Sequence, residues 1–108
     1  HLNPIERVST PSCRTYVEPN WHLFPIRVEE KNRKSVYTQL RSAGFGVQVN
    51  YLPAHLHPVF LEKGFKRGDY PNSENYYQRE ISLPMWPGIL APGGDYFETI
   101  ASVISKYN

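Results

Sequence analysis

The sequence predicts a small α/β (α+β) domain, a two-layer sandwich in which helices cover one face of a short, mostly antiparallel or mixed sheet. The first observation is that segments with the patterns of strands and helices alternate along the chain. The second is that 40% of the 108 residues are hydrophobic and 14% are aromatic. A chain of this length buries roughly 60 to 70% of its unfolded surface. One globular core is therefore expected.

The beginning of the chain predicts an irregular segment followed by a strand. Prolines interspersed with Ser, Thr and Asn are spread through residues 1–20, and they favour an extended, irregular lead-in. Residues 21–29 are aromatic and β-branched with partial alternation, which predicts a strand. Pro25 indicates that this strand lies at an edge or carries a bulge. We therefore divide the chain into a lead-in of residues 1–20 and a domain of residues 21–108.

A helix is expected next. Asn32 is a candidate N-cap, and Val36, Leu40 and Ala43 follow at helical spacing. Gly44 is the residue type that most often ends a helix in the left-handed conformation. This helix should cover one face of the sheet.

The middle of the chain predicts a strand, a loop and two helices. Residues 45–51 alternate between apolar and polar types, as a half-buried strand does. Residues 58–64 predict a brief helix, and the glycines and charges of residues 64–71 predict a loop. Asn72 or Ser73 is a candidate cap for a further helix with Glu74 in its first turn.

The end of the chain predicts a strand and a helix. Residues 81–85 form a short apolar run bounded by prolines, typical of a buried strand. From about residue 92 to 106, an apolar stripe predicts an amphipathic helix, formed by Phe97, Ile100, Ala101 and Ile104.

Charge and cysteine content exclude several classes of protein. Twelve basic and ten acidic residues give a net charge of +2, which is too balanced for a nucleic-acid-binding protein. The single cysteine, Cys13, excludes an internal disulfide and a thiolate zinc site, so a reducing, cytoplasmic location is expected. No signal peptide or membrane-spanning apolar run is present in the sequence. We expect neither a nucleic-acid nor a membrane partner.

Three sets of side chains are candidates for a binding site. His55 and His57 would point the same way in an extended segment, where they could bind a metal, recognise a polar ligand or serve the structure alone. Tyr51 at the end of a strand could line a ligand crevice or pack in the core. Lys66 and Arg67 lie in a basic loop that could meet a phosphate or form a solvated surface.

Other chemistries lack their motifs. No serine lies in a Gly-x-Ser-x-Gly turn, and no acidic pair suggests glycoside hydrolysis. The glycines form neither a Gly-x-Gly-x-x-Gly nor a Walker motif. A self-contained hydrolase or nucleotide-binding domain is therefore not expected, and we assign no metal ligands.

Three segments together resemble the C-terminal region of the DegT/DnrJ/EryC1/StrS aminotransferases, the pyridoxal-phosphate enzymes that aminate keto nucleotide sugars. They are VQVNYLPAHLHP at residues 47–58, GDYPNSE at residues 68–74 and ISLPMWP at residues 81–87. The resemblance looks closest to the branch that makes pseudaminic acid precursors from UDP-4-keto sugars. Many relatives carry histidine where this chain has Asn50.

The resemblance implies the small domain of a fold-type I aminotransferase, cut from a longer polypeptide and folded over a cofactor bound mainly elsewhere. Tyr51, His55 and His57 would line the substrate side, and Lys66 and Arg67 would meet nucleotide phosphate. The parent would use pyridoxal phosphate, take an amino group from glutamate, transfer it to a keto nucleotide sugar and form a homodimer.

The isolated chain, however, is expected to be inactive and to carry no cofactor. Transamination needs a lysine that binds the cofactor covalently. All five lysines lie in polar contexts, where an ammonium stays solvated and protonated: Lys31, Lys34, Lys63, Lys66 and Lys106. We assign no catalytic residue, and the cofactor contacts stay unknown. The alternative is a stand-alone, non-catalytic domain of the same fold that binds a sugar or a protein.

Overall fold

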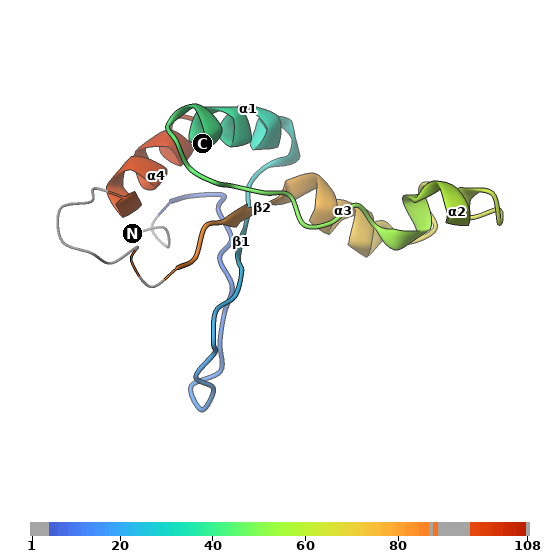
Figure 1. Cartoon of the computed structure of the whole chain (residues 1–108), viewed down its shortest axis with the longest axis horizontal. Helices are drawn as coiled ribbons and strands as arrows, with labels where there is room; N and C mark the ends of the chain where they lie inside the picture. Colours follow the sequence, from blue (N-terminus) through green and yellow to red (C-terminus); the bar gives the residue numbers. More distant parts are fainter. Residues whose placement is uncertain (1–4, 87, 89–95, 108) are drawn as a thin grey trace.

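The computed structural model describes residues 5–86, 88 and 96–107 (Figure 1). Their helices and strands follow one another in the order β1 (Phe24–Arg27), α1 (Glu30–Ser42), the 3₁₀ turn η1 (Ala54–Leu56), α2 (Pro58–Leu61), α3 (Pro71–Arg79), β2 (Glu80–Leu83) and α4 (Tyr96–Ser105). The predicted α+β class is confirmed, because a small sheet and several helices share one core.

The sheet is antiparallel. Strands β1 and β2 pair from Phe24 with Leu83 to Arg27 with Glu80. An isolated bridge continues the pairing on each side, from Ser9 to Arg27 and from Gln48 to Ser82. The lead-in therefore lies against β1 through Ser9, and the segment after α1 lies against β2 through Gln48.

The core lies between the sheet and two helices. Helices α1 and α4 lie on the same side of the two strands (Figure 1), which confirms the predicted two-layer arrangement. Buried apolar side chains from all four elements and from the segments beside them form one cluster: Ile26, Val28, Val36, Leu40, Phe45, Val47, Ile81, Leu83, Ile100, Val103 and Ile104. Burial of these side chains is the main term that favours the folded chain.

Helix α1 begins earlier than the sequence suggests. Its N-cap is Glu29, so the predicted cap at Asn32 is wrong. Asn32 lies inside the first turn, where its side-chain amide donates to the backbone oxygen of Tyr107 and ties α1 to the end of the chain. This tertiary contact explains why a residue typical of caps lies within the helix. The predicted stop is confirmed by Gly44, whose φ is +89°.

The prediction of a continuous strand over residues 45–51 is wrong. Only Gln48 pairs with the sheet, through two backbone bonds with Ser82 of 2.8 and 3.1 Å. Two residues later, the backbone N–H of Asn50 donates to a carboxylate oxygen of Glu80 at 2.7 Å. A side chain thus takes the place of the next backbone partner, and the pairing ends.

Residues 52–79, which we call the arm, extend away from the sheet and from α1 and α4 (Figure 1). The radius of gyration is 15.7 Å, whereas a compact chain of this length would have about 13 Å. Every residue from 57 to 73 is exposed. The arm therefore carries most of its surface outside the core.

The helices of the arm lie where the sequence predicts helices, but the cap predicted for α3 differs from the one observed. The predicted brief helix is confirmed as α2, which has proline in its first turn. Helix α3 begins at Pro71 after the N-cap Tyr70, so the predicted cap at Asn72 or Ser73 is wrong. Proline suits the first helical position because its ring sets a helical φ and no N–H is needed there. Of the predicted last helix, residues 92–95 lie outside the described residues.

Candidate active-site region

His55 lies at the base of the arm and is buried, with 7% of its surface exposed. Its Nε2 lies 2.8 Å from Oε1 of Glu74. The prediction that His55 and His57 point the same way is wrong, because Ala54–Leu56 is a 3₁₀ turn and not an extended segment. The exposed His57 instead directs its Nε2 to the backbone oxygen of Leu52, at 3.3 Å.

Glu74 joins three parts of the arm. Besides His55 of η1, its Oε1 accepts the backbone N–H of Gly68 at 2.7 Å, and its Oε2 lies 3.9 Å from Nη1 of Arg67. The hydrogen bond with His55 is the main cause that lowers the pKa of Glu74, although burial opposes it. The carboxylate therefore holds η1, the basic loop and α3 in one arrangement. The sequence indicated Glu74 only as a favourable first-turn acid.

A hollow of about 290 Å³ opens beside His55. Aromatic rings form much of its wall: the ring of Tyr70 lies 4.8 Å from that of His55, and Phe60 and Phe65 meet edge to face at 6.0 Å. Ala54 and Ser73 complete the lining. A wall of this kind suits an apolar or planar group.

The basic loop lies at the outer end of the arm. Gly64 and Gly68 have φ values of +93° and +95°, which L-residues with side chains rarely adopt. The backbone N–H of Lys66 donates to Oδ2 of Asp69 at 2.8 Å. Lys66 and Arg67 are both exposed, so their cations stand at the surface within the same turn.

Tyr51 is 71% exposed and lies outside the core, which contradicts the reading of this tyrosine as a core aromatic. It directly follows Asn50, where the chain leaves the sheet. The structure thus places Tyr51 directly before the arm and His55 and His57 in its first residues, whereas Lys66 and Arg67 lie in the loop between α2 and α3.

Glu80 is the residue that sequence reasoning missed. It is fully buried at the start of β2. Its Oε1 accepts the hydroxyl of Ser82 at 2.5 Å, and its Oε2 accepts the N–H of Asn50. The only signal in the sequence is an acidic residue directly before a buried apolar run.

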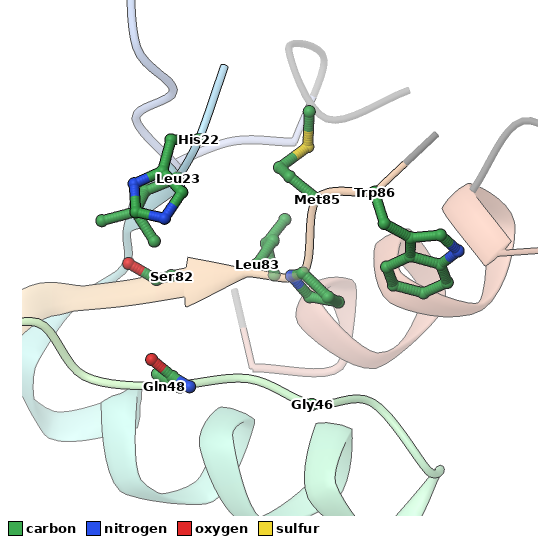
Figure 2. Close-up of a pocket in the computed structure, with 9 residues that line it drawn as sticks. His22, Leu23, Gly46, Gln48, Ser82, Leu83, Met85 and Trp86 are labelled. Atoms are coloured by element: carbon green, nitrogen blue, oxygen red, sulfur yellow. The ribbon is translucent and has the colours of Figure 1, made fainter. Parts of the chain in front are cut away.

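A second hollow, of about 270 Å³, lies over β2. Figure 2 shows that Gln48, Ser82 and Leu83 line it from the paired segments, while His22 and Trp86 approach from the chain before β1 and after β2. None of the residues predicted to bind substrate lines this hollow. Trp86 packs edge to face against Tyr96 at 5.2 Å.

The positions of the lysines matter because a pyridoxal-phosphate transaminase binds its cofactor covalently through a lysine. All five lysines are exposed, and none lines the hollows of the arm and of β2. A lysine that reacts at neutral pH needs burial or nearby cations to lose its proton.

Among the described residues, no group of three or more His, Cys, Asp and Glu side chains could hold a metal ion. Within the same residues, the helices are too short or too polar to cross a bilayer.

Comparison with known sequences relates nearly the whole chain to one family. The DegT/DnrJ/EryC1/StrS aminotransferase family matches residues 2–101. Uncharacterized protein MJ1066 of Methanocaldococcus jannaschii is 38% identical over 88 residues, which are 77% of this chain and 23% of that protein. The spore coat polysaccharide biosynthesis protein SpsC of Bacillus subtilis is 37% identical over 75 residues, which are 64% of this chain and 19% of that protein.

Solved structures share the fold. A putative sugar aminotransferase of Streptococcus pneumoniae, in its PLP form, has a TM-score of 0.79 at 28% identity over 94% of this chain and 27% of that one. PseC of Helicobacter pylori, an aminotransferase involved in the biosynthesis of pseudoaminic acid, has a TM-score of 0.62 at 26% identity over 80% of this chain and 23% of that one. The chain spans between 19% and 27% of the length of these four proteins.

Proposed function

The chain belongs to the DegT/DnrJ/EryC1/StrS aminotransferase family, and from this premise we propose that it is the C-terminal small domain of a nucleotide-sugar aminotransferase. The parent enzyme moves an amino group from glutamate to a keto nucleotide sugar by means of pyridoxal phosphate. The observation that carries the proposal is the family match over residues 2–101, joined to the likeness to a sugar aminotransferase of known structure. The sugar is of the UDP-4-keto class by the resemblance to the pseudaminic acid branch.

We assign the substrate contacts to five side chains. Tyr51 is exposed directly before the arm and His57 is exposed within it, so both can reach a sugar hydroxyl. The Nε2 of His55 is engaged by Glu74, and we assign the ligand contact to the part of the ring that lines the hollow of the arm. Lys66 and Arg67 supply positive charge for a phosphate group, a role that suits the guanidinium in particular.

The rest of the parent supplies what this chain lacks. All five lysines are exposed, and we place the covalent cofactor site in the rest of the parent polypeptide. We further propose that the parent is a cytoplasmic homodimer and that this chain alone does not transaminate.

The test compares the absorbance of the parent-length protein with that of the 108-residue chain after pyridoxal phosphate is added. We expect a visible cofactor band in the longer protein alone, and we expect glutamate to bleach it. If neither protein takes up the cofactor, the proposal is wrong and the chain is a non-catalytic binding domain. If the short chain takes up the cofactor by itself, the assignment of the covalent site to the rest of the parent is wrong.

A further inference from the structure

The pairing of residues 45–51 with β2 stops at one side chain. Gln48 and Ser82 exchange two backbone hydrogen bonds. In an antiparallel ladder of this register, the next pair to exchange such bonds is Asn50 with Glu80, because successive bonded pairs are two residues apart on each strand. The N–H of Asn50 donates instead to the carboxylate of Glu80, at 2.7 Å. The side chain thus replaces the carbonyl that would have continued the ladder.

The burial of Glu80 and the hydrogen bonds of its two carboxylate oxygens hold this contact in place. The side chain is fully buried, and none of the ion pairs among the described residues includes it. A buried carboxylate is costly unless its oxygens accept hydrogen bonds. Each oxygen accepts one, Oε1 from the hydroxyl of Ser82 and Oε2 from the N–H of Asn50. Moving Asn50 away would leave Oε2 of this buried side chain without its hydrogen-bond donor.

The residue at which the chain leaves β2 matters because Tyr51 directly follows it. Tyr51 is exposed, and residues 51–57 lead from the sheet to the hollow of the arm. Because the backbone of Asn50 is held in place, it sets the positions of the side chains that follow. Without the carboxylate, the ladder could extend by one more pair, or the segment could lift from β2, and both changes would move Tyr51.

We propose that Glu80 is a positioning residue for the substrate segment of residues 51–57, acting through the backbone of Asn50. The inference rests on the proposed function, because it assumes that this segment contacts the sugar nucleotide. Glu80 itself is fully buried and lies beneath the surface.

The first test compares Glu80→Leu with Glu80→Gln in the parent-length enzyme. Leucine removes both acceptors at similar volume. Glutamine keeps an oxygen for Asn50, and its amide can donate to the hydroxyl of Ser82, which accepts as well as donates. Glu98→Leu, at an exposed position on α4, is the matched control for removing a carboxylate. We expect hydrogen exchange of the Asn50 amide to accelerate in Glu80→Leu alone.

The second readout separates the two halves of the reaction. Bleaching of the cofactor band by glutamate does not need the sugar site, so it should stay within about twofold of wild type in every variant. The KM for a UDP-linked 4-keto sugar should rise about 10- to 100-fold in Glu80→Leu, since misplacement of contacts by about 1 Å has effects of this order. Glu80→Gln should restore the KM to within about threefold.

The outcomes are distinct. If the KM of Glu80→Leu equals that of wild type while glutamate still bleaches the band, the positioning role is wrong. If wild type itself fails to react with glutamate, the proposed function is wrong, and the exchange of the Asn50 amide still decides whether Glu80 anchors this segment. If Glu80→Leu does not fold, Ser82→Ala removes one bond to the carboxylate and should raise the KM in the same direction, with an unchanged KM refuting the role.

Discussion

Replacement of Ile81 by alanine tests whether β2 is the centre of the core. Ile81 is fully buried and lies opposite the fully buried Ile26 in the β1–β2 pair. Alanine removes three carbons, and at about 0.8 kcal/mol for each buried methylene the transfer term is roughly 2.4 kcal/mol. A residual cavity raises the expected loss to about 3 to 4 kcal/mol. Ile81→Val removes one carbon and should cost about 1 kcal/mol.

Urea unfolding of the 108-residue chain, followed by far-ultraviolet circular dichroism, measures this loss. With an m-value of about 1.5 to 2 kcal/mol/M, Ile81→Ala should lower the unfolding midpoint by about 2 M. Domains of this size are stable by only about 5 to 15 kcal/mol, so the fall is a large share of the total. Val59→Ala in α2 is the control, because Val59 is 53% exposed and should change stability by less than about 0.5 kcal/mol.

Two results would refute this reasoning. A loss below about 1 kcal/mol for Ile81→Ala at an unchanged m-value would mean that β2 is not packed as described. An equal loss for Val59→Ala would mean that the arm, rather than the sheet and its two helices, carries the stability.

Three further predictions follow from the arm and the turns. The pKa of Glu74 in the folded chain lies below its ordinary value of 4.5. The contact between Glu74 and His55 therefore stabilises the arm above pH 4.5, and this stabilisation is lost as the pH falls through the folded pKa. The NMR shift of the His55 ring should report the transition, and Glu74→Gln should abolish the transition. Gly44→Ala should cost about 1 to 2 kcal/mol because of its positive φ, whereas Gly46→Ala, in open space, should be neutral or stabilising by up to about 1 kcal/mol in the same urea assay. The exposed apolar side chains of the arm predict concentration-dependent association of this chain in sedimentation, which Val59→Lys should weaken; a monomer at every concentration would contradict it.

Local patterns predicted those parts of the fold that depend on neighbouring residues. The stop of α1 at Gly44 and the start of the brief helix at Pro58 lie where the sequence placed them, because a left-handed glycine and a first-turn proline act within a few residues. The caps were harder to predict. Asn32 lies inside α1, where it bonds to Tyr107, a partner that is distant in sequence.

The candidate site also has a part that the sequence predicted and a part that only the folded chain shows. Sequence spacing singled out His55, but only the folded chain joins it to Glu74. The prediction that His55 and His57 point the same way failed because the chain turns at Ala54–Leu56. Neither the composition nor the hydrophobic periodicity of the sequence could predict this turn. Two residues in a short polar segment carry too little pattern to distinguish a turn from a strand.

By itself, the sequence determined the α+β class, the order of most elements and the family resemblance. These follow from hydrophobic period, from glycine and proline, and from the succession of motifs, all of which are local along the chain. Only the tertiary structure decided that a buried carboxylate, Glu80, ends the pairing of residues 45–51 and that the arm stands away from the core. The physical reason is that a side-chain acceptor can replace a backbone carbonyl only when two segments 30 residues apart meet.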